Sequence, residues 1–355
     1  MNRYLFTAIL TIATCGGCEN NAIESKTSLQ ATEEASAPPI SVEGNSHSAT
    51  DRTSSDNVGT NLTDQRQQYV SFPAAGVKLV RPKGFDDAEN FHGFQQPNTK
   101  SSVMAVMIPG PYSETSRGFT AEQLKTHGMK LRSKEDVRVD GNTAVLLSVT
   151  QNAYGTEFEK WILAVGNEKE TRMVTATFPK SEEKKLSNQL KAVVLSTTID
   201  DTPPPDPTTD VGFVIAAPTK LKLTKGISKM LMYTKDGTIP LKSAEDPFFI
   251  AGSSISQGPI DDRRQFATQR LLNTANTRII AVISNSEITI DGLDGYEIVA
   301  DGNLTKSGNT VKVYQVLLYD DGTYILMQGR VAAHLADEYM SEFKTMARSL
   351  TRKPK

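Results

Sequence analysis

Covalent chemistry in this chain would fall to two cysteines, Cys15 and Cys18, which are separated by Gly16 and Gly17. The spacing matches a redox pair, in which one thiolate attacks and the other resolves, but such a pair needs a βαβ setting. A short apolar leader precedes these residues and a polar tail follows them. A structural disulfide is a second interpretation, although a three-residue step at a chain end restrains little of the unfolded chain. Neither interpretation explains why the remaining chain has no cysteine.

The same stretch resembles the lipobox of bacterial lipoproteins, in which a small residue precedes the cysteine that receives acyl chains such as palmitate. Cys18 follows Gly17 and fits, whereas Cys15 follows the bulkier Thr14 and fits less well. The chain departs from the family three residues before Cys18, where the family favours leucine and this chain has Cys15. The resemblance implies a signal peptide over residues 1–17 and lipid attachment at Cys18, with Cys15 as the alternative residue. It places the protein on the extracytoplasmic side of a membrane in the cell envelope, and a plain secreted protein is the alternative.

The leader itself has the order of an export signal. Arg3 supplies a positive start, and Tyr4–Ala13 is a short, mostly apolar run. Such a run is too short to span a bilayer as a stable helix. No apolar run elsewhere in the chain reaches the length of about 18–20 residues that a membrane-spanning helix needs.

Acid–base chemistry would need a histidine or a carboxylate with a partner. His127 is predicted to share a helix face with Leu124, Gly128 and Leu131, which suits either a buried acid–base group or a packed histidine. The matching position in the second half of the chain is Gln269, so no shared site is indicated. His92 and His334 have no acid–histidine pattern near them in sequence.

Carboxylates occur in pairs at Asp261-Asp262 and Asp320-Asp321, and paired acids can bind hard cations or divide acid and base work. Asp262 also stands where a helix N-cap is expected, and Asp321-Gly322 stands where a hairpin turn is expected. Two further stretches, Asp291–Gly295 and Asp301–Asn303, faintly resemble a calcium loop but lack its alternating oxygen ligands and final glutamate. We predict caps and turns at all of these positions, and no metal or cofactor.

Trp161 lies in the middle of a predicted strand, where it would serve either as a stacking platform or as a core residue. Tyr314 occupies the corresponding place later in the chain, which favours core packing.

The sequence has no nucleophile elbow, zinc-binding helix signature, P-loop or dinucleotide-binding glycine pattern. The net charge of −2 gives no basic excess for nucleic acid. The sequence therefore predicts no catalytic residue.

The elements that would position these residues begin after a polar, acidic segment. Residues 18–68 have scattered apolar residues without a period, so we predict a disordered tether with a reach of roughly 40 Å. A proline-rich linker is predicted over 201–209. The flanking segments, 69–200 and 210–355, are predicted to be two domains, each long enough to bury its own core.

These two segments repeat one pattern. Gly76–Pro82 corresponds to Gly212–Pro218, and Val137–Gly141 corresponds to Ile288–Gly292. Gly110-Pro111 and Gly258-Pro259 each close an apolar strand, and each segment then has a capped helix, at Thr120 and at Asp262. Each segment ends in an amphipathic helix, in which Lys191, Ser196 and Thr198 align with Lys344, Ser349 and Thr351.

Each segment therefore reads as three strands, a helix, four strands and a helix. Strands Phe158–Val165 and Val311–Tyr319 are apolar on both alternating sets, so helices must cover both faces of a mostly antiparallel sheet. The predicted fold class is α+β, with two tandem α/β/α sandwiches.

This order of elements resembles the PsbP-like fold, which includes photosystem PsbP proteins, Mog-type Ran-binding proteins and bacterial DcrB-like envelope lipoproteins. The resemblance covers about 280 residues and carries no functional residue to this chain. It implies a binding or assembly role, since members are mostly non-enzymatic. The leader makes the envelope branch nearest, and the photosystem branch stays open.

The sequence thus predicts a membrane-anchored, non-catalytic module that binds a protein of the cell envelope. A metal-assisted hydrolase around the paired aspartates is one alternative. A purely structural envelope lipoprotein is another.

Overall fold

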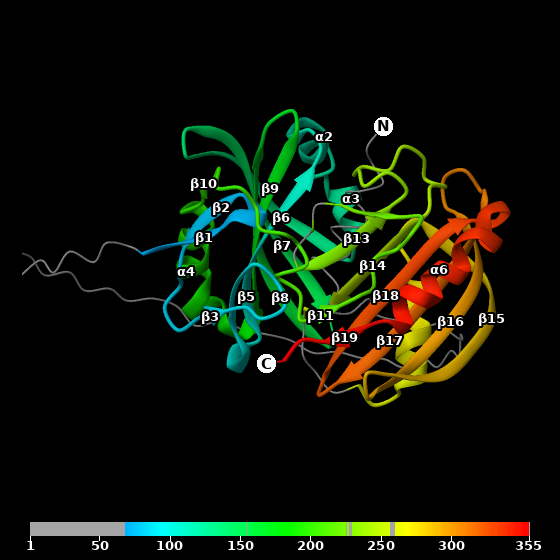
Figure 1. Ribbon diagram of the computed structural model, residues 1–355. Coiled ribbons are helices and arrows are strands. Elements are labelled where there is room, and N and C mark those ends of the chain that lie inside the picture. The colour runs from blue at the N-terminus through cyan, green and yellow to red at the C-terminus, as the bar shows by residue number, and fades with distance from the viewer. Residues whose placement is uncertain (1–67, 154, 225, 227–228, 256–259, 355) are drawn as a thin grey trace, which may run out of the picture. The chain divides into compact units, whose positions relative to one another are not determined.

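The computed structural model describes residues 68–354, apart from residues 154, 225, 227–228 and 256–259 (Figure 1). Cys15, Cys18, the predicted signal peptide and all but the last residue of the predicted tether lie outside the described residues, as does the predicted Gly258-Pro259 strand end. The described part is α+β, with two large antiparallel sheets of seven strands each. The predicted fold class is therefore correct.

The sheet of the first half has seven antiparallel strands, and β6 is its edge strand at the end opposite β3. Every neighbouring pair runs antiparallel, because short turns or loops join strands that are consecutive along most of the sheet. In spatial order the strands are β3 (Asp86–Asp87), β4 (Gly93–Gln96), β5 (Ser101–Pro109), β9 (Glu170–Pro179), β8 (Thr156–Gly166), β7 (Asn142–Ala153) and β6 (Met129–Val139).

The sheet of the second half repeats this order, with β15 in the place of β6. In spatial order its strands are β12 (Lys222–Leu223), β13 (Met230–Thr234), β14 (Phe248–Ser253), β18 (Thr323–Ala332), β17 (Thr310–Asp320), β16 (Leu293–Leu304) and β15 (Thr277–Ile290). In both halves an Asp-Gly pair joins the edge strand to its neighbour. Asp140 and Asp291 have φ of 49° and 50°, as the first residue of a two-residue hairpin turn requires.

Each half has one smaller sheet, which joins a strand near its start to its last strand. The first contains β1 (Tyr69–Phe72), β2 (Val77–Val80) and β10 (Thr198–Ile199), and the second contains β11 (Phe213–Val214) and β19 (Thr351–Arg352). The predicted count of three strands before the first helix is too low: among the described residues, five precede it in the first half and four in the second. Strands of two to four residues are too short to show an alternating pattern.

The helices are α2 (Tyr112–Arg117), α3 (Ala121–Lys125), α4 (Glu183–Leu195), α5 (Arg263–Leu272) and α6 (Ala336–Arg348). Single 3-10 turns are η1 (Pro73–Ala75), η2 (Pro97–Thr99), η3 (Lys180–Glu182) and η4 (Ala333–Leu335). Within the described residues, none of these helices has the length and apolar character needed to cross a membrane.

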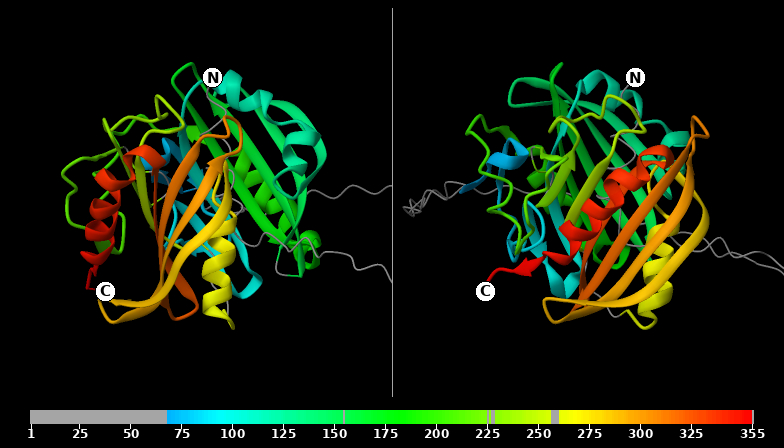
Figure 2. Two further views of the ribbon diagram at one scale, coloured as in Figure 1. Left: turned by 90° about the vertical axis from the view of Figure 1, so that its right-hand side faces the viewer. Right: turned by 45° about the vertical axis from the view of Figure 1, so that its right-hand side comes forward.

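Helices cover both faces of each large sheet, as predicted. In the second half, Phe343 and Met346 of α6 pack in one core cluster with Tyr314 of β17, and Leu271 of α5 packs in another with Leu317. Figure 2 shows α6 and α5 on opposite sides of their sheet. In the first half, α4 and α3 play these roles against alternate residues of β7 and β8. Each half is thus an α/β/α sandwich.

The two halves also repeat individual hydrogen bonds. The backbone N–H of Val80 donates to Ser196 Oγ at 3.2 Å, and that of Ala216 donates to Ser349 Oγ at 2.8 Å. These serines follow α4 and α6, and each binds the chain at or just after an early strand of its half, β2 or β11, to the end of its last helix. The sequence alignment of Ser196 with Ser349 therefore places equivalent residues in equivalent contacts.

Candidate binding surface

The first predicted helix is shorter than its sequence pattern suggested. The backbone N–H of Gln123 donates to Thr120 Oγ1 at 3.2 Å, which confirms the cap, but α3 ends at Lys125. Gly128 has a φ of 70°, and β6 begins at Met129. The prediction that His127 and Leu131 share a helix face is therefore wrong. Burial lowers the pKa of His127, whose backbone carbonyl accepts a hydrogen bond from Gln151.

His92 has a partner that lies far away in sequence. Its Nε2 is 3.2 Å from Asp210 Oδ2, and its side chain is 11% exposed. Burial lowers the pKa of His92, which outweighs the opposing effect of Asp210, so the imidazole is neutral at pH 7. His334 lies in η4. None of the described histidines joins a group of three or more metal-ligating side chains.

The paired aspartates mostly serve the backbone. The N–H of Gln265 donates to Asp262 Oδ1 at 2.8 Å, so Asp262 is the N-cap of α5. Asp321 has a φ of 37° and joins β17 to β18, so the predicted turn is also correct. The predicted turns at Asp294-Gly295 and Asp301-Gly302 are wrong, since both pairs lie inside β16. A side chain at Gly295 would collide with the carbonyl of Leu317, so glycine there allows close strand contact.

Trp161 is a core residue, as favoured. It is partly buried against the core cluster that includes the apolar residues of α4. Two residues of α4 contact it: its Nε1 donates to Ser187 Oγ at 3.2 Å, and Lys191 Nζ lies 4.6 Å from the ring centroid. Tyr314 is fully buried and donates to Glu297 Oε1 at 2.8 Å. Burial and this carboxylate raise the pKa of Tyr314. Both residues hold the closing helix of their half onto the sheet.

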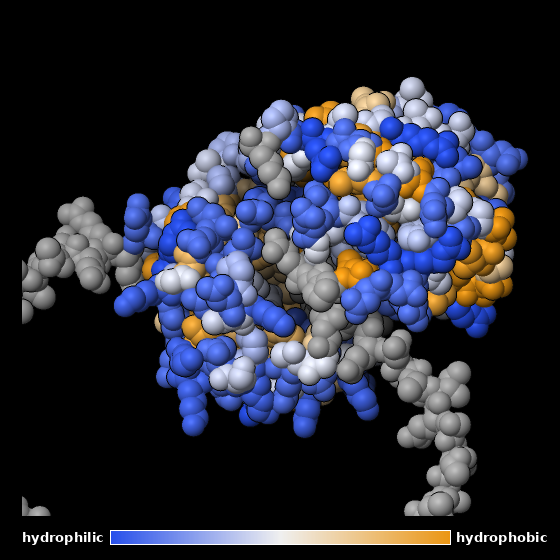
Figure 3. All heavy atoms as spheres, turned by 90° about the horizontal axis from the view of Figure 1, so that it is seen from below, coloured by the Kyte–Doolittle hydropathy of each residue, from blue (hydrophilic) through white to orange (hydrophobic). Residues whose placement is uncertain are grey.

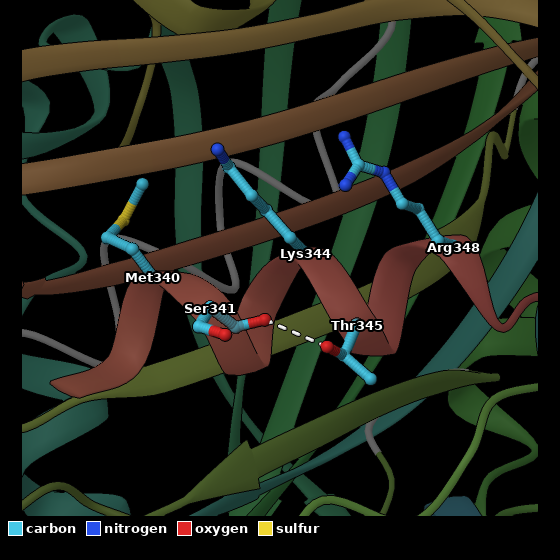
Figure 4. A pocket seen from close by; sticks show the side chains of 5 residues that line it. All are labelled: Met340, Ser341, Lys344, Thr345 and Arg348. Atoms are coloured by element: carbon cyan, nitrogen blue, oxygen red, sulfur yellow. Dashed lines mark hydrogen bonds between the residues drawn. The ribbon is translucent and has the colours of Figure 1, made fainter. Parts of the chain in front are cut away.

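A shallow hollow of about 400 Å³ runs along α6, lined by Met340, Ser341, Lys344, Thr345 and Arg348. Figure 4 shows Met340, Lys344 and Arg348 side by side along one flank of the helix. Arg348 already forms an ion pair with Glu297 at 3.0 Å, and Thr345 Oγ1 donates to the carbonyl of Ser341. The lining offers two cations, two hydroxyls and one thioether.

The most unusual surface lies on the edge strand β15. Ile280, Val282 and Ile283 are 54%, 43% and 56% exposed, and we call these three residues the β15 patch. Figure 3 shows apolar surface at its right-hand margin, on the side where Figure 1 places β15. Edge strands present unpaired backbone groups, and proteins usually protect them with charges, short length or bulges. A 14-residue edge strand with an exposed apolar centre is poorly protected by the first two means.

The equivalent strand of the first half is protected in the usual way. Counting back from the Asp-Gly turns, Ile283 corresponds to Arg132, and both stand at a shift in strand register. Arg132 Nη1 donates to Glu159 Oε1 at 2.7 Å. Apart from Met129, Leu131, Ser133, Val137 and Val139, β6 consists of charged residues. The two halves therefore differ most clearly in what their edge strands offer to another molecule.

Sequence reasoning missed this surface, although the signal was present. Ile279–Ile283 is an uninterrupted run of five apolar residues, followed by four polar ones, just before the predicted strand Ile288–Ile290. Such a run is typical of a buried strand, and only the order of the described strands reveals that β15 lies at the end of its sheet.

No protein-family model matches the chain, and no curated protein matches it. Among solved structures, the chain is similar to LpqN, described as involved in cell envelope biogenesis of Mycobacterium tuberculosis, with 18% identity and a TM-score of 0.31; the match covers 40% of this chain and 83% of LpqN. It is similar to the cyanobacterial PsbP of Synechocystis, with 11% identity, a TM-score of 0.28, and coverage of 37% and 91%. It is also similar to the T6SS immunity protein TplEi of Pseudomonas aeruginosa, with 13% identity, a TM-score of 0.27, and coverage of 76% and 97%. None of these likenesses carries a residue or a function to this chain.

Proposed function

We propose that the chain is a non-catalytic protein-binding module, held on the extracytoplasmic side of a membrane by a lipid on Cys18, with β15 as its binding strand. The observation that carries the binding role is the contrast between the two edge strands. The same position in the same fold holds a charged, ion-paired residue in β6 and an exposed isoleucine in β15. Exposed apolar patches on soluble proteins commonly mark interaction sites.

The proposed organisation has a signal peptide at 1–17, a tether at 18–68, PsbP-like domains at 69–200 and 210–355, and a linker at 201–209. Two observations support the domain bounds. The last strand of each half, β10 or β19, pairs with a strand near the start of the same half. Each half also has its own pair of core clusters, one on each face of its sheet.

A hydrolase around the paired aspartates has no support from their geometry. Asp262 and Asp321 serve a helix cap and a turn, and the described residues hold no group of three potential metal ligands. A purely structural envelope lipoprotein remains the competing role, and it predicts that β15 is irrelevant to any partner.

The anchor has a direct test. Replacing Cys18 with alanine is expected to move the chain from the membrane fraction to the soluble fraction, because acyl chains supply the binding free energy. Replacing Cys15 with alanine is the matched control and should leave the chain with the membrane. Membrane flotation with immunoblotting measures both. If only the Cys15 variant is released, the lipid is assigned to Cys15 and not to Cys18. If neither variant is released, the lipid anchor is rejected.

The binding role is tested by chemical crosslinking and affinity capture of the full chain from its own membranes, read by mass spectrometry. A reproducible protein, which can be a second copy of this chain, is expected with the native chain and with Thr289→Arg. It should be at least tenfold depleted with Ile283→Arg, which adds the same charge to the same strand inside the β15 patch. Thr289 is exposed and lies outside that patch, so it controls for charge alone. Equal capture by both variants, or no capture by the native chain, would contradict the proposal.

A further inference from the structure

The β15 patch has a register shift on each side of Val282, and charged residues of opposite sign lie toward the two ends of the strand. Its register against β16 shifts twice, between Ile279 and Ala281 and between Val282 and Ser284. One extra residue therefore stands on each side of Val282. The only charged residues of the strand, Arg278 and Glu287, lie near its two ends. The strand is apolar at its centre and oppositely charged toward its two ends.

We propose that the occupant of β15 is β15 of a second copy of this chain, lying antiparallel with Val282 at the twofold axis. This inference rests on the proposed function and names the partner of its binding strand. An interface of this kind is isologous, so each residue meets its counterpart by the same rotation. The β15 patches of the two copies then cover each other at the centre.

The register shifts favour a copy over an unrelated strand. A bulge bends and twists the edge, which hinders pairing with a strand of regular register. A copy turned about Val282 sets Ile280 opposite Ser284 and Ile283 opposite Ala281, so each extra residue lies one position from an extra residue of the other copy. Four residues from the axis in either direction, Arg278 meets Ser286 of the second copy.

The charges agree with the same register. Arg278 of one copy lies one position from Glu287 of the other copy, on the opposite face of the joined sheet, so opposite charges lie near each other at both ends of the paired strands. An axis moved to Glu287 would set two like charges directly opposite each other, which is destabilising. It would also leave Ile280 and Ile283 uncovered. The register about Val282 therefore avoids like charges in direct opposition and covers the apolar residues of the strand.

Disulfide trapping tests this register in the full chain within its membrane. Directly opposed residues have Cα atoms about 4.5–5.5 Å apart, which suits a disulfide. Val282→Cys is therefore expected to give a dimer on non-reducing gels under mild oxidation. Thr289→Cys is the matched control, because two copies of residue 289 would lie roughly 40 Å apart. The native chain is run beside them to show any bridging through Cys15 or Cys18.

Two further variants keep the test sharp. On the Val282→Cys background, Ile283→Arg is expected to lower the trapped dimer at least fivefold, and so is Arg278→Glu. Adding Glu287→Arg to Arg278→Glu should restore trapping, because the exchanged charges again meet opposite charges. Equal trapping at residues 282 and 289, no trapping at 282, or no rescue by the exchange would overturn the second-copy arrangement. Disulfide trapping can fail while, in the capture experiment, Ile283→Arg still prevents capture of a protein of different sequence. In that case β15 remains the proposed binding strand, and only the second copy is rejected as its partner. If both experiments fail, the proposed function fails too.

Discussion

Replacing Phe343 with alanine is expected to lower the free energy of unfolding by about 3–5 kcal/mol. Phe343 is completely buried on α6, with its ring centroid 5.8 Å from that of Phe249 and 6.4 Å from that of Tyr339. Its ring lies directly over Gly329 of β18. Alanine would leave a cavity between helix and sheet, bordered by both aromatic neighbours. Urea unfolding followed by circular dichroism measures the loss.

The first half has a different pair of side-chain sizes at the positions equivalent to Gly329 and Phe343. Gly329 faces Tyr314 across the strands, and Ala176 faces Trp161 in the same way. Leu190 takes the place of Phe343 there, so a larger helix residue accompanies a smaller strand residue. A Cβ added to Gly329 would lie 2.5 Å from the Phe343 ring. Gly329→Ala should destabilise the protein by about 1–3 kcal/mol, and Phe343→Leu should recover part of that loss. Independent, additive effects would show that the two positions do not share a packing constraint.

Replacing Gly93 with alanine is expected to cost at least about 3 kcal/mol, since it adds both backbone strain and a collision. Gly93 begins β4 with a φ of 139°, a region that residues with a side chain rarely adopt. An added Cβ would lie 1.9 Å from the carbonyl oxygen of Val103 on β5, and the paired backbone there cannot move aside without breaking the ladder. Urea unfolding again gives the measurement.

Gly141 allows the cost of backbone strain to be measured without the cost of a steric collision. Gly141 has a φ of 75° but no atom within 4 Å of an added Cβ. Gly141→Ala should therefore cost only about 1–2 kcal/mol, from the backbone conformation alone. If both variants lose the same stability, the close approach of β4 to β5 contributes nothing and the steric argument is wrong.

Local signals in the sequence predicted local structure well. The N-caps at Thr120 and Asp262, the turns at Asp140 and Asp291, and the closing helix with Phe343 are each determined by residues a few positions apart. The coverage of both sheet faces followed from strands that are apolar on both sides. These features depend on periodicity and capping, which a sequence displays directly.

Features that depend on distant residues were not predictable. Asp210 meets His92 across 118 positions, and no local pattern joins them. The spacing of Leu124 and Leu131 matched a helix, yet Gly128 ended it and the second leucine belongs to a strand. A left-handed glycine after a short helix was the signal that mattered more than the apolar spacing. The exposure of β15 depends on its place at the end of a sheet, which only the strand order fixes.

The small sheets that close each half have a consequence for how such a chain arises and changes. β10 pairs with β2, and β19 pairs with β11, so each half ends beside a strand near its own start. Among the described strands, each seven-stranded ladder contains only strands of its own half. A gene segment that encodes one half can therefore be duplicated, lost or fused in tandem without cutting a ladder, because its entry and exit points already lie together. After such a duplication one copy can keep a charged, inert edge while the other diverges toward an apolar one, which is the difference now seen between β6 and β15.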